Sequence, residues 1–251
     1  MTGYKIEKTI CIEQKDKNRI CKSNFASSFK NVSHSLMIKN NFVIRHRGYI
    51  QKEDRNRLNR HDSGVIWFTG LSASGKSTIA HHVEKILYDE EIRAYVFDGD
   101  NIRHGLNADL EFSDEDRKEN IRRIVEVARL FADAGIVVLA SFITPFREQR
   151  EYIRKHCVGI KFAEVYVKCD VQECIRRDPK GLYKKAQMGI IKNYTGISSP
   201  FEEPVTPDLI LDTQELTIDE SVAKTINFLK ETSFLQLPPS LSFQGSSAKK
   251  L

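Results

Sequence analysis

Short apolar runs alternate with amphipathic segments from about residue 65 to residue 230. Five of these runs, each of three to five mostly apolar residues, have the composition of parallel strands that are buried on both faces. The predicted strands are Val65–Thr69, Ala94–Phe97, Ile136–Ala140, Ala163–Val167 and Leu209–Leu211. The segments between them predict helices at about 76–90, 114–134, 145–156, 170–177 and 218–230. This alternation predicts an α/β fold, a three-layer sandwich in which helices cover both faces of a mostly parallel sheet.

Composition divides the chain into three parts. Residues 1–41 form a basic extension that we expect to be flexible, since residues 1–40 carry eight basic and three acidic side chains and so hold the whole net charge of +5. Residues 42–230 form the predicted domain, in which Asp54–His61 resembles a charged linker. About residues 178–207 are rich in proline, glycine and lysine, which favours a mobile lid. Residues 231–251 are predicted to be a disordered tail.

The placement of charge and the lack of long apolar runs exclude several classes of partner. A nucleic-acid-binding domain carries its basic excess on the folded part, whereas here the excess lies in the extension. No run approaches the ~18 apolar residues of a membrane-spanning helix. The five cysteines show no C-x-x-C spacing, which favours a reducing compartment. We therefore expect a cytoplasmic protein without nucleic-acid or membrane partners, and leave open whether the basic extension targets an organelle.

The sequence from Gly70 to Ser77 reads G-L-S-A-S-G-K-S, directly after the strand Val65–Thr69 and at the start of a predicted helix. This G-x-x-x-x-G-K-[ST] pattern is the P-loop, whose glycines allow backbone N–H groups to surround phosphate oxygens. Lys76 is expected to contact the β and γ phosphates of ATP, and Ser77 to bind Mg²⁺. The predicted ATP-binding residues are Gly70, Ala73, Ser74, Gly75, Lys76, Ser77 and Thr78.

A second polar cluster, Asp98-Gly99-Asp100-Asn101-x-Arg103, follows the strand Ala94–Phe97. Open α/β sheets bind ligands at the carboxyl ends of their strands. Asp98 and Asp100 are therefore candidate catalytic residues beside Lys76. We assign metal support to Asp98 and proton acceptance from the attacking hydroxyl to Asp100, a division that the sequence leaves open. The same residue types also favour a plain turn.

The predicted helix 114–134 carries several arginines, which on an amphipathic helix are usually solvated. Arg117 and Asn120 are three residues apart and share one helical face, an arrangement that suits an anionic substrate. Phe112 lies just before this helix and can serve either for stacking on a ligand or for core packing.

Together, these motifs resemble those of adenylylsulfate kinases over about residues 42–230. The matching stretches are Gly70–Thr78, Asp98–Asn107, Phe112–Arg123, Phe131–Arg150, Asp178–Ala186 and Tyr194–Ile197. The resemblance implies transfer of the γ-phosphoryl group of ATP to the 3′-hydroxyl of adenylyl sulfate, which gives 3′-phosphoadenylyl sulfate and ADP. It also implies that Phe112 and Tyr194 enclose the adenine, and it adds Thr144 to the catalytic group. The implied substrate-binding residues are Asp100, Asn101, Ile102, Arg103, Phe112, Arg117, Asn120, Ile143, Thr144, Lys180, Asn193 and Tyr194.

Three residues depart from the commonest family pattern. Ala73 replaces a frequent glycine, Glu111 replaces the glycine before the Phe-Ser pair, and Thr144 stands where serine is typical. The glycines that the loop requires remain, so we expect the methyl group of Ala73 to be tolerated. Thr144 keeps a hydroxyl, but the change puts any phosphoserine intermediate in doubt.

Two other functions fit parts of the pattern. Another small-molecule P-loop kinase would share the P-loop, and only Phe112, Arg117, Asn120, Lys180 and Tyr194 set it apart. A nucleotide-binding switch protein of the GTPase type would need an Asn-Lys-x-Asp sequence, which is absent. Adenylyl sulfate is therefore the expected small-molecule partner, ATP and Mg²⁺ the expected cofactors, and a homodimer the expected assembly.

Overall fold

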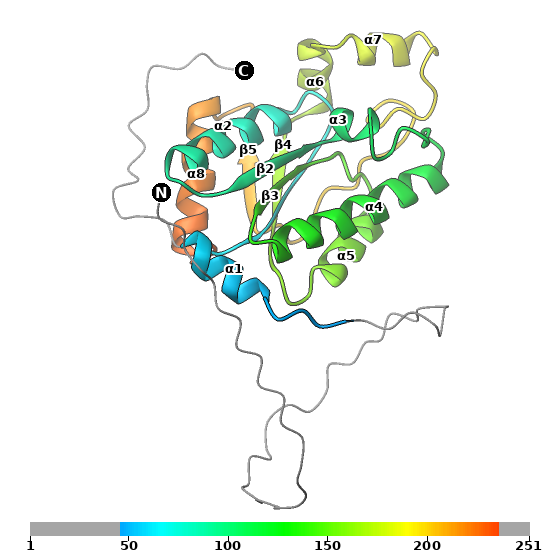
Figure 1. Ribbon diagram of the computed structural model, residues 1–251. Helices are drawn as coiled ribbons and strands as arrows, with labels where there is room; N and C mark the ends of the chain where they lie inside the picture. Colours follow the sequence, from blue (N-terminus) through cyan, green and yellow to red (C-terminus); the bar gives the residue numbers. More distant parts are fainter. Residues whose placement is uncertain (1–45, 236–251) are drawn as a thin grey trace, which may run out of the picture. The chain divides into compact units, whose positions relative to one another are not determined.

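The computed structural model describes residues 46–235, and a compact unit begins at Gly48. The predicted extension over residues 1–41 lies outside the described residues (Figure 1). The centre of the unit is a five-stranded sheet with the order β2-β3-β1-β4-β5. Every neighbouring pair in it is parallel. The strands are β1 (Gly64–Thr69), β2 (Ala94–Asp98), β3 (Val137–Ser141), β4 (Lys161–Lys168) and β5 (Leu209–Asp212).

Helices cover both faces of this sheet, as the sequence predicts. The helices are α1 (Lys52–Asn59), α2 (Lys76–Asp89), α3 (Gly99–Arg103), α4 (Asp114–Asp133), α5 (Arg147–His156), α6 (Val171–Arg177), α7 (Leu182–Gln187) and α8 (Ile218–Glu231). Side chains of α2 and α8 pack on one face, and those of α4 and α5 on the other. No helix of the described residues is long and apolar enough to cross a membrane. The predicted three-layer α/β fold is confirmed.

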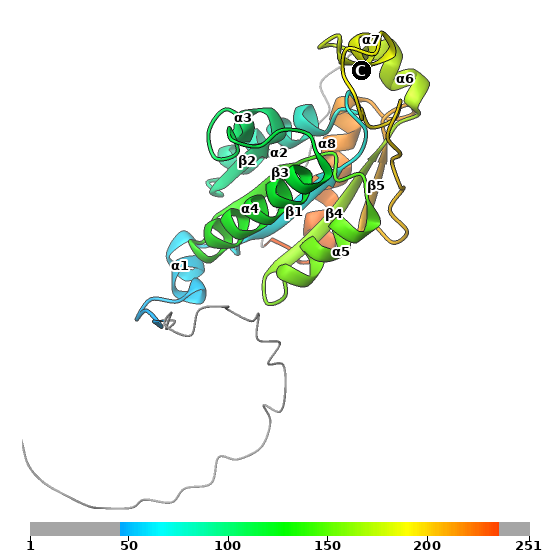
Figure 2. The same ribbon diagram turned by 90° about the vertical axis from the view of Figure 1, so that its right-hand side faces the viewer.

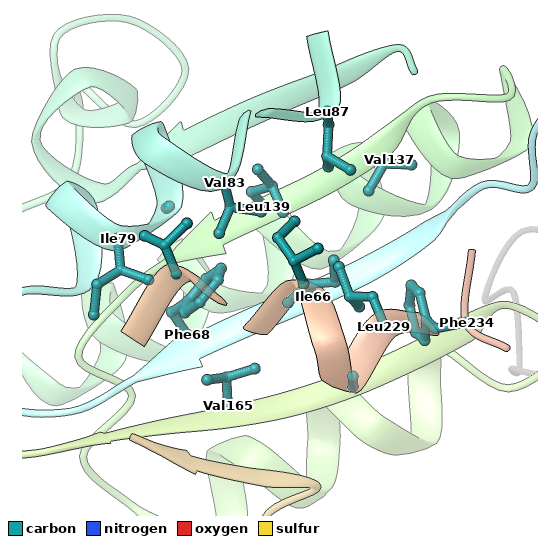
Figure 3. Packing of buried hydrophobic residues seen from close by; sticks show 14 of the residues in the cluster. Ile66, Phe68, Ile79, Val83, Leu87, Val137, Leu139, Val165, Leu229 and Phe234 are labelled. Carbon is teal, nitrogen blue, oxygen red and sulfur yellow. The ribbon is translucent and has the colours of Figure 1, made fainter. Parts of the chain in front are cut away.

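Alternate residues of the central strand β1 build the two halves of the core. Ile66 and Phe68 point to the cluster formed with α2 and α8, whereas Val65 and Trp67 belong to the cluster formed with α4 and α5. Figure 3 shows the first of these clusters, with Ile66 and Phe68 among the side chains of the neighbouring helices. All residues of β1 are buried, since neighbouring side chains of a strand point to opposite faces and helices cover both.

The parallel arrangement brings the loops that follow the strands to one edge of the sheet. The segments after β1, β2 and β3 meet there, and α6 and α7 lie beyond the same edge (Figure 2). A third small apolar cluster, which includes Leu71, Cys174 and Tyr183, joins α6 and α7 to the loop after β1. The sequence motifs that follow the strands therefore converge at this edge.

The interpretation of Asp54–His61 as a linker is wrong, because most of it forms helix α1. This helix has no buried residue and therefore shows no apolar periodicity in the sequence. Polar contacts hold it in place: Arg55 forms an ion pair with Asp133 at 3.0 Å, and Asn59 Nδ2 donates to the Gly135 carbonyl at 2.9 Å. Contacts between residues so distant in the chain leave no local signal.

Two predicted boundaries also change. Phe234 and Leu235 are buried in the core, so the prediction of a disordered tail is wrong for residues 231–235, and residues 236–251 lie outside the described residues. The lid predicted over residues 178–207 contains helix α7, although its prolines and glycines predict irregular structure. Tyr183 of α7 is fully buried, and this packing stabilises a helix that is too short to show a periodic pattern.

Candidate functional site

A cavity of about 230 Å³ opens at the carboxyl edge of the sheet, where the sequence motifs converge. Its wall combines the loop after β1, the starts of α3 and α4, the segment after β3, and part of the lid. The lining residues are Ser72, Ala73, Lys76, Ser77, Asp98, Gly99, Asp100, Arg103, Phe112, Arg117, Asn120, Ile121, Ser141, Phe142, Ile143, Thr144, Pro145, Gln149, Lys180, Tyr194 and Thr195.

The loop between β1 and α2 has backbone conformations that favour glycine. Gly70 has φ 149°, and a Cβ atom there would lie 2.4 Å from the Val167 carbonyl oxygen. Gly75 precedes α2 with φ 102°. Ala73, the departure from the family pattern, has φ 61°, which an L-residue adopts at a cost of roughly 1–2 kcal/mol. The loop therefore holds the methyl group of Ala73 in a strained conformation.

Lys76 is the most deeply buried cation of the cavity wall, with 7% of its surface exposed. Its Nζ donates to the Leu71 carbonyl oxygen at 2.6 Å, within its own loop. Burial lowers the pKa of Lys76 to about 8, because the nearby charges of Asp98 and Asp100 offset the loss of solvation only in part. The loop thus holds an amine that an anionic ligand would strongly stabilise in its charged form.

Asp98, at the end of β2, contacts the start of α2 directly and the end of β3 through Ser77. The Ser77 hydroxyl donates to Asp98 Oδ2 at 2.6 Å and lies 3.1 Å from the Ser141 hydroxyl. Asp98 Oδ1 accepts from the backbone of Asp100 and so caps the short helix α3. Burial alone would raise the pKa of the Asp98 carboxyl, but the hydrogen bonds from Ser77 and the α3 backbone outweigh it and lower that pKa. The Asp98-to-Arg103 sequence therefore forms a capped helix whose carboxylates line the cavity, and the plain turn is excluded.

Asp100 faces the lid rather than the loop after β1. Its carboxylate forms an ion pair with Lys180, and this hydrogen bond raises the pKa of the lysine. About 61% of the Asp100 side chain is exposed, so the carboxylate remains open to a ligand in the cavity. The pair links α3 to the lid.

Arg103 and Arg117 both contact Phe112, one at its ring and one at its backbone. The Arg103 guanidinium lies 4.4 Å from the centre of the Phe112 ring, and Arg117 Nε donates to the Phe112 carbonyl at 3.1 Å. Arg117 Nη2 also donates to the carbonyl of Asn193 in the lid at 2.7 Å. Phe112 is 61% exposed and lines the same cavity as Tyr194, so the structure brings together the two rings predicted to enclose a base.

Thr144 lies in the cavity wall with its hydroxyl enclosed. Its Oγ1 donates to Thr69 Oγ1 at 2.7 Å and lies 3.4 Å from Trp67 Nε1, which donates to it. The residue has φ 40°, a strained value for a β-branched side chain. The Thr144 hydroxyl thus forms its hydrogen bonds with side chains of β1. This favours a positioning role over the catalytic role implied by the resemblance.

Other predicted residues form the frame of the cavity rather than its lining. Gly70, Ser74 and Gly75 shape the loop, Thr78 lies in the first turn of α2, Asn101 and Ile102 belong to α3, and the Asn193 carbonyl is bound by Arg117. Asn120 lines the cavity and is buried, as is Ile143 in part.

Several lining residues were missed from the sequence. Ser141 directly follows a predicted strand, and Gln149 lies near the start of a predicted helix. Both are polar, but this signal is too weak to single them out. Thr195 follows Tyr194 directly, inside one of the matching stretches, and its hydroxyl lies 3.4 Å from Arg117 Nη1. The remaining ones are apolar or small and differ from core residues only through their place in the fold.

Comparisons with known proteins agree with this geometry. A family model described as Adenylylsulphate kinase matches residues 62–212. A probable adenylyl-sulfate kinase of Halalkalibacterium halodurans is 56% identical over 187 residues, which cover 74% of this chain and 93% of that protein. An adenylyl-sulfate kinase of Oceanobacillus iheyensis is 49% identical over 199 residues, 79% of this chain and 100% of that protein. The structure of the Mycobacterium tuberculosis APS kinase CysC in complex with AMPPNP and APS is similar with a TM-score of 0.66 and 50% identity, and the match covers 67% of this chain and 98% of that one.

The strain at Ala73 predicts a gain in stability on replacement by glycine. Ala73→Gly should raise the free energy of unfolding by about 0.5–1 kcal/mol, because the left-handed conformation is relieved and only part of the gain is lost to the freer unfolded chain. Urea denaturation measures the change. The matched control is Ala80→Gly inside α2, which should lower the stability by about 1 kcal/mol or more. A loss at position 73 as large as that at position 80 would contradict the assignment of strain.

Proposed function

This chain belongs to the adenylylsulfate kinase family, and from that premise we infer that it transfers the γ-phosphoryl group of ATP to the 3′-hydroxyl of adenylyl sulfate. The products are ADP and 3′-phosphoadenylyl sulfate. One observation carries this inference: a phosphate-binding loop and the Phe112, Arg117 and Asn120 set face a single cavity that the lid residues Lys180 and Tyr194 complete.

Lys76 supplies the positive charge at the phosphate end of the cavity. Its ammonium is bound to a neutral carbonyl of its own loop, which phosphate oxygens of ATP can replace. A charged phosphate favours the charged form of the lysine and so restores the pKa that burial lowers. In a largely dissociative transfer the protein acts by positioning and by stabilising the charge on the moving phosphoryl group, and a buried lysine does both.

The residues around Ser77 fit a magnesium ion that is shared with the nucleotide. The hydroxyls of Ser77 and Ser141 and the Asp98 carboxylate lie together and provide the oxygen ligands that Mg²⁺ prefers. Among the described residues no group of three or more His, Cys, Asp or Glu side chains could hold a metal alone, so ATP phosphates and water would complete the coordination. The ion would neutralise charge on the phosphates.

Asp100 is the better proton acceptor of the two aspartates. Asp98 already accepts hydrogen bonds from Ser77 and from the α3 backbone, which leaves it suited to orient Ser77 and to support the metal. Among the residues that the structure describes, Asp100 is paired through one oxygen, to Lys180, and it lines the cavity with most of its side chain exposed. We therefore assign proton acceptance from the 3′-hydroxyl to Asp100, as the sequence suggests.

The rest of the cavity suits an anionic nucleotide. Lys76, Arg103, Arg117 and Lys180 give the lining a surplus of positive charge over its two aspartates. Phe112 and Tyr194 offer ring faces for the adenine, since offset stacking on aromatic rings is favourable. Arg117 holds the Phe112 segment and the lid together, so its main role in this arrangement is to position the stacking ring. A homodimer and a cytoplasmic location remain predictions.

Measurement of ADP release in a coupled assay tests the function. Turnover with adenylyl sulfate should be far higher than turnover with AMP, adenosine or gluconate. Of these compounds, only adenylyl sulfate both stacks on the aromatic rings and engages all the donor groups of the cavity. A higher rate with gluconate or adenosine would identify another small-molecule kinase. A preference for GTP, with no acceptor-dependent turnover, would favour a switch protein.

The assignment of the base predicts a specific kinetic signature. Asp100→Asn should lower kcat by about 10²–10⁴-fold with little change in KM for adenylyl sulfate, because an amide keeps the shape of the carboxylate but cannot accept the proton. Steady-state kinetics with both substrates measure it. The control is Asp89→Asn, a surface aspartate paired with Lys85, which should leave both constants unchanged. A mild Asp100→Asn beside a severe Asp98→Asn would reverse the two roles.

A further inference from the structure

Gln149 is a buried polar residue of the cavity wall for which the chemistry described above has no use. It lies in the first turn of α5, is 8% exposed, and lines the cavity. Its Oε1 is enclosed and has no hydrogen-bond partner among the described residues. Nε2 has no partner there either, and an unpaired buried polar group costs roughly 1–3 kcal/mol, so the NH₂ end calls for an acceptor that arrives with a ligand.

Asn120 of α4 lines the same cavity, and a neighbour fixes the orientation of its amide. Asn107 Nδ2 donates to Asn120 Oδ1 at 2.9 Å, which occupies the acceptor end of the Asn120 side chain. The donor end, Nδ2, is left for the cavity. In Gln149 the enclosed atom is Oε1, whereas Nε2 is not enclosed and has no hydrogen-bond partner among the described residues, so its NH₂ group is the accessible end of the carboxamide. Asn120 and Gln149 therefore offer two neutral N–H donors from neighbouring helices.

The shape of the substrate shows which part reaches these donors. Adenylyl sulfate has three extensions from its ribose: the base, the 3′-hydroxyl, and the phosphosulfate. The base is assigned to Phe112 and Tyr194 at the cavity mouth, and the 3′-hydroxyl must lie near Asp100 and Lys76. The rest of the lining is left for the phosphosulfate, and its polar members include Arg103, Arg117, Asn120, Thr144, Gln149 and Thr195.

We propose that Gln149 is a specificity-determining residue which, beside Asn120, donates an N–H group to the sulfate end of adenylyl sulfate. This proposal rests on the proposed function and adds a subsite to it. The sulfate end carries no proton at neutral pH and can only accept hydrogen bonds, so the N–H groups of Asn120 and Gln149 fit it. Hydrogen bonds from neutral donors to an anion are among the stronger ones, and they are stronger still in a site shielded from water.

Two substitutions and one ligand comparison test the subsite. Gln149→Leu keeps the size but removes the donors, and should weaken binding of adenylyl sulfate about tenfold or more, the loss of one hydrogen bond to a charged group. Gln149→Glu keeps the shape but adds a negative charge, and should weaken it further. Binding of AMP, which lacks the sulfate, should change less than twofold in Gln149→Leu, as should KM for ATP. Calorimetry measures both dissociation constants, and Gln172→Leu on the exposed face of α6 is the matched control.

The comparison of the two ligands separates substrate contact from a structural role. A variant that merely disturbs the cavity would weaken AMP and adenylyl sulfate equally, and this result would overturn the proposal. Unchanged binding of adenylyl sulfate in both folded variants would overturn it as well. Failure of the wild-type protein to phosphorylate adenylyl sulfate would instead contradict the proposed function, whatever the variants do.

Discussion

The buried ammonium group of Lys76 is the constraint on which the site depends. The lysine can be buried because β1 lies at the centre of the sheet and α2 starts directly after the loop, so the fold surrounds this loop with core. Gly70 allows the loop to pass within contact of β4, where a side chain would collide with the Val167 carbonyl. The result is an amine whose loss of solvation the charges of Asp98 and Asp100 offset only in part, so that it is poised for an anionic ligand.

The lid is attached to this site by polar contacts rather than by an apolar interface alone. Lys180 pairs with Asp100, and Arg117 donates to the Asn193 carbonyl. A small apolar cluster around Tyr183 anchors the first part of the lid behind the loop of Lys76. Substrate that engages Asp100 or Arg117 therefore competes for contacts that hold the lid, which couples substrate binding to the position of the lid.

The sequence predicts most of the fold because apolar periodicity marks the elements that build the core. The strands and the long helices follow it, whereas α1 shows none, since polar contacts with Asp133 and Gly135 hold it. In the site, the loop residues and the aspartates are predictable because their chemistry requires a fixed spacing. The enclosed hydroxyl of Thr144 and the unpaired carboxamide of Gln149 are not, because both depend on side chains distant in the chain.

The proton balance of ATP binding tests the role of Lys76 most directly. At about pH 8.5 the free protein holds this amine mostly neutral, because burial lowers its pKa to about 8. Contact with the phosphates of ATP should raise the pKa of Lys76 again, so that ATP binding takes up about three quarters of a proton. Calorimetry in buffers of different ionisation enthalpy measures this uptake. The exposed lysine variant Lys85→Met should show the same uptake. Tight binding of ATP at this pH without proton uptake would contradict the account.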